Sequence, residues 1–322
     1  MGANTDTLPL CTVYLRTVLL FSPCFLLNHI MVVFVRNDGN PKLAMTAMLT
    51  GSLANIALDY LFLYPLNMGI FGAALATGTA PVIGLCLSSL HILTGRNQFR
   101  LARPAEVPRS LADMAGLGSA AFLNEFTACM VLALYNTLML RAAGTIGVAA
   151  YGIVANLALM ALALFTGLSQ GAQPLISQSY GRGDHHTVRQ LCRLALLVSC
   201  LVGLALALIA QVWADPLAAL FNRDGDPELA RLAVSGLRLY FWGFLFAGPN
   251  IIAASFLGAV EQPRASFLLS LFRGGVGIAI LVLLLSYLLG VTGIWLAFPV
   301  TEAITLLLCL GASRRILASP TP

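Results

Sequence analysis

An acidic side chain inside a long apolar segment is the feature of this sequence that most directly indicates chemistry. Glu125 lies in residues 114–140, a stretch long enough to cross a lipid bilayer. A carboxylate at bilayer depth costs about 3 kcal/mol on insertion scales unless it finds a partner, a proton or a cation. Shielding from water favours the protonated form of a carboxyl group, so Glu125 is a candidate for proton or cation uptake. The alternative is a structural glutamate bonded to a neighbouring serine, asparagine or arginine.

Two further sets of residues could bind a charge. Asn55 and Asp59 are four residues apart, so on a helix they share one face and can hydrogen-bond or hold a cation together; the alternative is that they tie helices together. Glu302 either lines a cavity or pairs with Arg273, the arginine that we place in a membrane interior. Pairing is favoured because a lone buried arginine is also costly.

Several uncharged polar side chains also lie within apolar segments. Such groups either contact substrate or bond neighbouring helices, and the second role is the commoner one. The candidates for a substrate cavity, besides Glu302, are Asn124, Tyr135, Asn156, Gln170 and Gln173. The last two flank a helix break that we expect to end at Pro174.

The sequence gives no support for an enzyme or a metal site. Residues 167–171 match the G-x-S-x-G pattern of a nucleophile elbow, but that motif needs a strand, a turn and a histidine partner. No histidine follows residue 186, and His185-His186 lacks the spacing of metal ligands. We therefore expect no catalytic residues, no metal and no cofactor other than a coupling ion.

The composition identifies the class of protein that must position these residues. The chain has 322 residues, of which 59% are hydrophobic and 10% are charged, whereas soluble domains carry about 25% charge. This predicts an all-α polytopic membrane protein. The net charge of +5 is spread over loops and forms no patch for nucleic acid. About 20 apolar residues span the hydrocarbon core, and the sequence predicts nine such segments: 11–35, 43–64, 70–94, 114–140, 148–173, 190–213, 232–258, 265–289 and 293–311.

The charges in the loops predict the orientation of these segments. Twelve lysines and arginines fall on one set of loops and five on the opposite set. Because cytoplasmic loops carry the excess of positive charge, the first set and the C-terminus are predicted to be cytoplasmic.

The chain also partly repeats itself. Leu15-Arg16 recurs as Leu237-Arg238, 222 residues later, and Asn40-Pro41-Lys42 recurs at the same offset as Gln262-Pro263-Arg264. After a one-residue slip, the spaced residues Gly69, Gly72 and Ala76 recur as Gly290, Gly293 and Ala297. An even number of crossings separates the copies, so they run in the same direction as a parallel repeat. Three segments precede the second copy and none precedes the first, which predicts that the chain lacks the first three helices of a twelve-helix parent.

Several motifs resemble those of the multidrug and toxic compound extrusion (MATE) transporters, from about residue 11 to 311, and the glutamine-rich one resembles the MepA-like branch. They are Tyr14-Leu15-Arg16, Asp38-Gly39-Asn40-Pro41, Asn55-Ile56-Ala57-Leu58-Asp59, Met68-Gly69-Ile70-Phe71-Gly72-Ala73-Ala74-Leu75-Ala76-Thr77, Ala150-Tyr151-Gly152-Ile153-Val154, Gln170-Gly171-Ala172-Gln173-Pro174-Leu175 with Tyr180-Gly181, and Gly293-Ile294-Trp295-Leu296-Ala297.

The resemblance implies a two-lobe helical bundle of which this chain would hold helices four to twelve. Residues 1–95 would be the remainder of the first lobe, 96–113 a cytoplasmic linker, and 114–315 the second lobe. Asn55, Asp59 and Thr77 match a cation or proton site of the first lobe, although its first-helix acid has no counterpart here. Glu125 matches an acid that faces the cavity of the second lobe.

The function implied by the resemblance is antiport in a bacterial inner membrane. Organic cations and drugs would leave the cell as protons or sodium ions enter, by alternating access in a monomer within the lipid bilayer. Two alternatives stay open: a flippase of lipid-linked oligosaccharides from the same superfamily, and an inactive truncated fragment.

Overall fold

The computed structural model describes residues 8–95, 97–98, 107–222, 225–260 and 262–318. These residues form helices throughout, and they contain no strand. The chain divides into two compact units, residues 1–105 and 106–322. The predicted linker 96–113 lies partly outside the described residues, and the assignment of the lobes to 1–95 and 114–315 stays a prediction.

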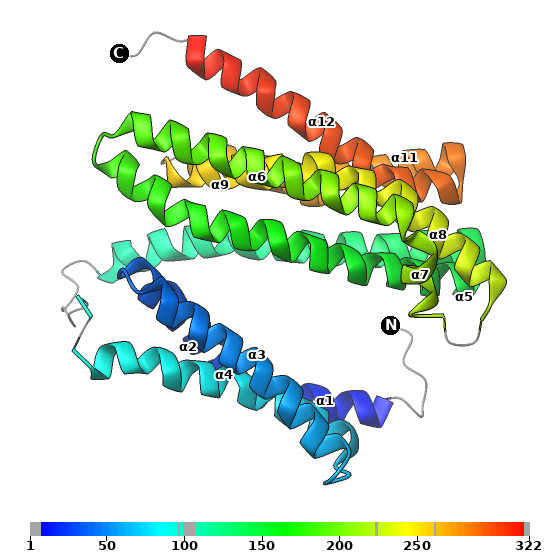
Figure 1. Cartoon of the computed structure of the whole chain (residues 1–322), viewed down its shortest axis with the longest axis horizontal. Coiled ribbons are helices and arrows are strands. Elements are labelled where there is room, and N and C mark those ends of the chain that lie inside the picture. The colour runs from blue at the N-terminus through cyan, green and yellow to red at the C-terminus, as the bar shows by residue number, and fades with distance from the viewer. Residues whose placement is uncertain (1–7, 96, 99–106, 223–224, 261, 319–322) are drawn as a thin grey trace. The chain divides into compact units, whose positions relative to one another are not determined.

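Unit 1, residues 1–105, holds α1 (Leu8–Leu20), α2 (Ser22–Asn37), α3 (Pro41–Leu63) and α4 (Gly69–Leu93) (Figure 1). A bend of 47° separates α1 from α2. Pro23 stands in the first turn of α2, where its missing N–H costs no hydrogen bond. Pro41 opens α3 in the same way, and the Asn40 side chain caps this helix by accepting a hydrogen bond from the Leu43 N–H. Both the bend before α2 and the start of α3 therefore follow from the local sequence.

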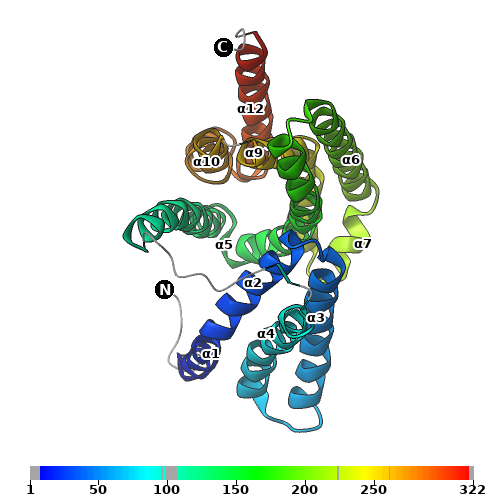
Figure 2. The same ribbon diagram turned by 90° about the vertical axis from the view of Figure 1, so that its left-hand side faces the viewer.

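Unit 2, residues 106–322, begins with α5 (Val107–Gly181) (Figure 2). Ala143 and Gly144 have non-helical backbone angles, so α5 is two helices joined across a sharp kink. The unit continues through α6 (His185–Val212), α7 (Ala214–Ala219), α8 (Pro227–Tyr240), the 3-10 turn η1 (Phe241–Gly243), α9 (Phe244–Ala259), α10 (Pro263–Leu271), the π-turn η2 (Phe272–Val276), α11 (Gly277–Leu289) and α12 (Val291–Ala318).

The core of unit 2 is built around stacked aromatic rings. Tyr135 stacks on Tyr151 with ring centres 5.1 Å apart, and Tyr240 stacks on Phe298 at 4.3 Å. Small residues let neighbouring helices come close to these rings, because helix association in a membrane depends on close packing. Gly236, for example, lies so close to the Trp295 ring that a Cβ there would stand 2.9 Å from it. The core therefore joins both halves of α5 to α8 and α12.

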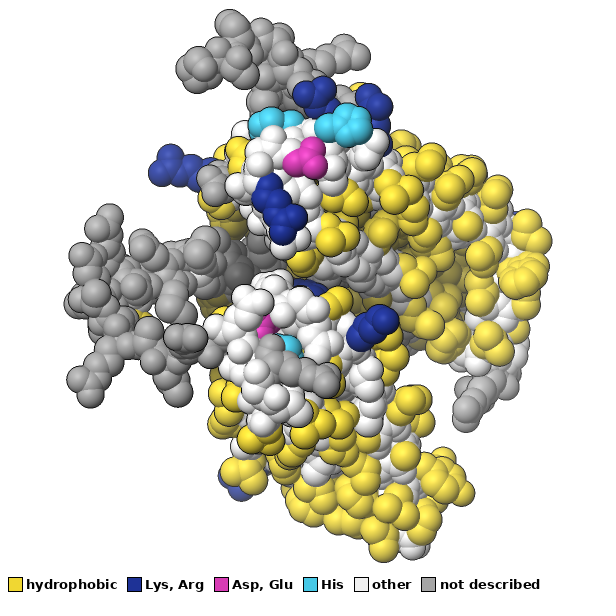
Figure 3. All heavy atoms as spheres, turned by 60° about the vertical axis from the view of Figure 1, so that its left-hand side comes forward, with side chains coloured by type: hydrophobic (Ala, Val, Ile, Leu, Met, Phe, Trp, Pro, Cys, Tyr) yellow, Lys and Arg dark blue, Asp and Glu magenta, His cyan; other side chains and the backbone are white. Residues whose placement is uncertain are grey.

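The described helices fit a membrane. Seven are long and apolar enough to cross one, and the bent pair α1–α2 provides an eighth span. One of the seven is α5, whose 60-residue apolar part would, at 1.5 Å per residue, be about three times as long as the hydrocarbon core is thick. Counting its two halves separately gives the nine predicted spans. Figure 3 shows the broad apolar surface that these helices present, with charged side chains gathered near helix ends.

The internal repeat is visible in the backbone. The break between α1 and α2 falls at Phe21, and η1 interrupts the second copy 222 residues later. Gly69 and Gly290, which correspond in the two copies, both have positive φ, at 56° and 58°. Gly72 and Gly293, three residues on, both pack so tightly on the preceding helix that a Cβ would overlap it. The two copies therefore share turn chemistry as well as sequence.

The shared turn gives a test of the fold. Gly290→Ala should lower the free energy of unfolding by about 1 kcal/mol, because a Cβ is strained in the left-handed region. The measurement is the thermal midpoint in detergent. Gly152→Ala, in a helix with open space around the position, is the matched control and should leave the midpoint unchanged or raise it. Equal effects of both substitutions would contradict this account of the turn.

Candidate functional site

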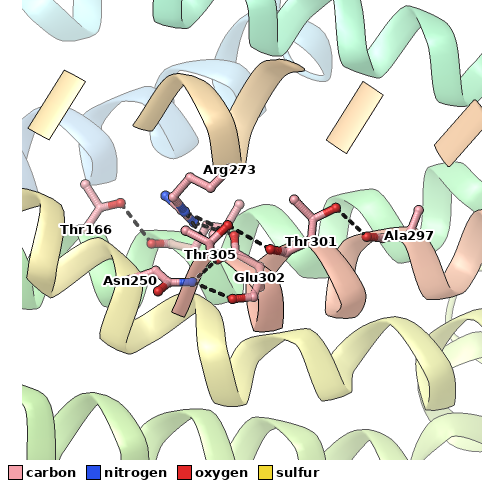
Figure 4. A network of polar contacts seen from close by, with 8 residues as sticks. Thr166, Asn250, Arg273, Ala297, Thr301, Glu302 and Thr305 are labelled. Atoms are coloured by element: carbon pink, nitrogen blue, oxygen red, sulfur yellow. Dashed lines mark hydrogen bonds and ion pairs between the residues drawn. The ribbon is translucent and has the colours of Figure 1, made fainter. Parts of the chain in front are cut away.

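A buried charged network crosses unit 2 between three helical elements (Figure 4). Arg273 of η2 donates from Nη2 to Oε1 of Glu302 on α12 at 2.8 Å, and from Nε to the same oxygen at 3.1 Å. Asn250 of α9 donates from Nδ2 to Oε2 of Glu302 at 2.7 Å and to its backbone carbonyl at 2.8 Å. Glu302 is therefore held from both sides, and Arg273 is its partner in the described structure.

Burial strengthens the attraction between the charges of this network, but it also removes their hydration. The side chain of Glu302 is 1% exposed and that of Arg273 is 17% exposed. Two charges in so dry a place attract strongly, but each also loses its hydration, so the pair gains little net stability over apolar packing. The threonines on either side, Thr301 and Thr305, donate to carbonyls of their own helix. Arg273 and Asn250 thus satisfy the carboxylate.

Asn250 is the member of this network that the sequence analysis did not single out. It is fully buried, and its Oδ1 has no hydrogen-bond partner in the structure. The repeat contained a signal for it: Asn28, 222 residues earlier, also has a buried Oδ1 without a partner. A polar residue at the same place in both copies indicates a common position within the bundle.

Glu125 lies on the exposed face of α5. Two stacked, exposed rings, Phe122 and Phe126, lie beside it, with centres 5.9 Å apart. Among the described residues, no hydrogen bond or ion pair involves its carboxylate. Its neighbour Asn124 turns inward and has a buried Oδ1 without a partner. The structural glutamate that we considered as an alternative would need a bonded neighbour, and none is present in the described part of the chain.

The three predicted residues of unit 1 lie on α3 and α4, which pack extensively against each other. Asn55 and Asp59 are partly buried on α3, but the buried Nδ2 of Asn55 has no hydrogen-bond partner, so the amide does not bond the Asp59 carboxylate. The Thr77 hydroxyl of α4 donates to Ala73 on its own helix at 2.9 Å. No hydrogen bond between described residues joins the three side chains to one another.

The remaining candidates for a substrate cavity are dispersed. Tyr135 is 1% exposed within the aromatic core, and its hydroxyl has no hydrogen-bond partner among the described residues. Asn156 is exposed and donates to Gly152 on its own helix. Gln173 is exposed, and Gln170 is partly buried. The helix break predicted between them and Pro174 is wrong, because α5 continues through Pro174 to Gly181. Their placement in a shared cavity stays a prediction.

Among the cavities lined by described residues of unit 2, two are open to the surface. One, of about 530 Å³, is lined by residues of α7 and α8 that include Asp215, Arg231 and Arg238. The other, of about 300 Å³, is lined by Asn136, Thr137, Leu140, Thr145 and Val148 on either side of the kink in α5. Neither cavity includes Glu125 or Glu302.

Unit 1 contains a second polar cluster at the ends of its helices. His91, near the end of α4, donates from Nε2 to Asp38 Oδ2 at 2.8 Å, and the same oxygen accepts the Gln98 N–H at 3.0 Å. Asn40 Nδ2 lies 3.4 Å from His91 Nδ1, which assigns that ring nitrogen as the acceptor. The hydrogen bond from His91 and then that from Gln98 lower the pKa of Asp38 below its ordinary 3.8. The cluster therefore fastens α2, α3 and α4 to the chain that follows them.

The described residues contain no group of three or more histidine, cysteine or acidic side chains able to hold a metal ion.

Comparisons with known proteins follow this geometry. A family model described as MatE matches residues 121–288. The multidrug export protein MepA of Staphylococcus saprophyticus is 24% identical over 306 residues, which are 94% of this chain and 67% of that protein. MepA of Staphylococcus aureus strain MSSA476 is 23% identical over 308 residues, with the same coverage.

Solved structures show the same fold. An outward-facing multidrug resistance MATE family transporter of the MOP superfamily aligns with a TM-score of 0.89 at 21% identity, over 99% of this chain and 72% of that one. A mutant of the Vibrio cholerae MATE transporter VcmN aligns with a TM-score of 0.88 at 22% identity, again over 99% and 72%. The expected helical fold is confirmed.

The buried pair gives a prediction on stability. Glu302→Ala should cost about 3–5 kcal/mol, because it leaves the Arg273 guanidinium buried without a counter-charge. Asp215→Ala removes the acid of the exposed Arg238–Asp215 pair and should cost less than about 1 kcal/mol. Chemical unfolding in detergent compares the two. A similar cost for both would mean that Arg273 reaches water when its partner is removed.

The Asp38 cluster gives a prediction on pH. Since its folded pKa is depressed, the stability that ionised Asp38 contributes is complete above 3.8 and is lost as the pH falls below that value. Asp38→Asn should therefore lower the thermal midpoint at neutral pH and flatten its fall under acid conditions. Glu228→Gln, at an exposed acid whose carboxylate makes no hydrogen bond or ion pair among the described residues, should change both much less. An unaltered acid response in Asp38→Asn would contradict the role given to this carboxylate.

Proposed function

The chain belongs to the MATE family, and on that premise we propose that it is a cation-coupled antiporter that exports organic cations. The two MepA relatives are multidrug export proteins by name, which supports a transporter of small molecules rather than an enzyme. We place it in the plasma membrane of a bacterium as a monomer, with its C-terminus in the cytoplasm. Alternating access between two lobes would carry the substrate, and a proton or sodium ion would drive it.

The observation that carries this proposal is the charge balance of unit 2. Within its predicted spans the sequence places two carboxylates, Glu125 and Glu302. Glu302 is neutralised by Arg273, so Glu125 is left without a described counter-charge. A carboxylate that must be neutralised at bilayer depth will bind a proton, a metal cation or a cationic substrate. Competition among these for one group is a simple basis for exchange.

In this mechanism Glu125 exchanges its cation as the cavity opens alternately to the two sides of the membrane. A proton or sodium ion entering from outside displaces the substrate, and a substrate entering from the cytoplasm displaces the ion. Asn55, Asp59 and Thr77 would form a second cation site in unit 1, because amide, carboxylate and hydroxyl oxygens suit hard cations.

A flippase of lipid-linked oligosaccharides would need excess positive charge facing the pyrophosphate of its substrate. In unit 2 the one arginine of the predicted membrane interior is already paired with Glu302. The charge balance thus favours a cationic substrate.

The test is Glu125→Gln in the full 322-residue chain, reconstituted in vesicles with ethidium as the organic cation. Gln keeps the shape of the side chain but cannot exchange a cation, so efflux driven by a pH or sodium gradient should be lost. Glu228→Gln, an exposed acid at the start of α8, is the matched control and should transport normally. Undiminished efflux in Glu125→Gln would refute the assignment, and no efflux by the unaltered chain would refute the proposed function.

A further inference from the structure

The arginine of the buried pair stands on an irregular turn. Arg273 is the second residue of the π-turn η2, which interrupts the span formed by α10 and α11. The Gly277 N–H bonds the carbonyl of Phe272, five residues back. A π-turn holds one residue more than the α-helix and has poorer packing, and such turns occur frequently at functional sites. The presence of Arg273 in this π-turn therefore indicates that the turn has a functional role.

A π-turn also gives the helix a way to rotate. Successive residues of an α-helix are about 100° apart around the axis. If the extra residue moves along the helix past Arg273, the guanidinium turns by roughly that angle relative to α12. A rotation of this size is enough to break the two hydrogen bonds that join Arg273 to Oε1 of Glu302.

The two glycines after Arg273 have opposite surroundings. Gly274 faces open space, whereas a Cβ on Gly275 would overlap the Thr127 methyl group of α5. One side of the turn is thus free to move, and the other is in close contact with the helix that carries Glu125. A change in η2 would therefore act on α5 within two residues of the proposed coupling acid.

The pair itself is suited to opening. A buried ion pair adds little stability over apolar side chains of the same volume, so stability alone does not account for its presence. When Arg273 leaves, Glu302 stays buried beside Asn250 Nδ2 and becomes a carboxylate that requires another cation. The buried Oδ1 of Asn250, which has no partner, is a ready additional ligand or acceptor if this amide turns.

We propose that Glu302 is a second coupling carboxylate, and that Arg273 is a built-in cation that occupies it whenever the coupling ion is absent. This deepens the proposed function and rests on it: Glu125 exchanges an external cation for substrate, while Glu302 exchanges its cation for Arg273. The π-turn is the moving element, and its contact with Thr127 links the two carboxylates. Arg273 is a positioning residue, since it acts through Glu302.

Among the described residues, the titratable groups near Glu302 include Arg273 on η2, Tyr240 on α8 and Cys309 on α12, and the last two lie within electrostatic range of the pair. Substituting each of these groups in turn shows whether Glu302 is the one that makes η2 respond to pH. Cys309→Ser and Tyr240→Phe should each preserve the response, whereas a response lost in either variant and kept in Glu302→Gln would overturn the assignment.

The main experiment replaces both charges at once. Arg273→Met with Glu302→Leu keeps the volume of the pair and should fold at least as well as the parent chain, because apolar packing replaces a desolvated ion pair. Ethidium efflux should nevertheless fall on the order of tenfold, a loss within the usual range of coupling between sites. The control removes the exposed pair, with Arg238→Met and Asp215→Leu, and should transport normally. Wild-type efflux in the Arg273/Glu302 double variant would show that the pair is only structural and would overturn the proposal.

A readout independent of transport separates this inference from the proposed function. Hydrogen exchange in peptides covering Phe272–Val276 should rise when the parent chain is acidified or given sodium, because either cation would take the place of Arg273 at Glu302. Glu302→Gln, which is neutral at every pH, should show fast exchange in both conditions. Exchange that is slow in all variants and unaffected by acid or sodium would overturn the proposed movement of the π-turn. If the chain shows the change in hydrogen exchange but exports no ethidium, the proposed antiport would be refuted. The proposed movement of the π-turn would still be supported.

Discussion

A charge in an apolar interior must be neutralised, and this constraint organises the second unit of the protein. Glu302 meets it with three hydrogen bonds from Arg273 to its carboxylate and one from Asn250, which also donates to the backbone carbonyl of Glu302. Those contacts join α9, η2 and α12, so one buried carboxylate determines how three elements pack. Because the cost of an unpaired charge is several kcal/mol, these elements cannot separate unless another cation takes the place of the guanidinium.

The same constraint gives Glu125 a different role. It lies in an equally apolar segment, but no described base accompanies it. The contrast between a paired and an unpaired acid in one unit is the physical basis for assigning exchange to Glu125 and for treating Glu302 as a site with its cation already in place. Both residues connect to η2, one through an ion pair and the other through the helix that carries Thr127.

Small residues and helix breaks make these positions possible. Without a hydrophobic drive between helices in lipid, close approach depends on glycine and alanine, as at Gly236 against Trp295 and Gly275 against Thr127. Breaks at Phe21 and in η1 recur at the same point of the repeat, whereas the π-turn has no counterpart in α3, where the corresponding segment is regular helix. The two copies therefore share a scaffold, and the second has an added irregularity at its arginine.

Much of the fold could be predicted from the sequence, because hydrocarbon thickness imposes a length on every span and apolar composition marks it directly. The spans and the position of Glu125 within one of them were available in this way, and the internal repeat was available from residues that recur 222 positions apart. Arg273 and Glu302 could be named as partners on energetic grounds alone. The tertiary structure decided what depends on distance and rotation: that Asn250 joins the pair, that Arg273 stands on a π-turn, and that Asn55, Asp59 and Thr77 make no mutual hydrogen bond. Helix rotation and inter-helix contact come from the packing of residues far apart in the chain, which no local pattern records.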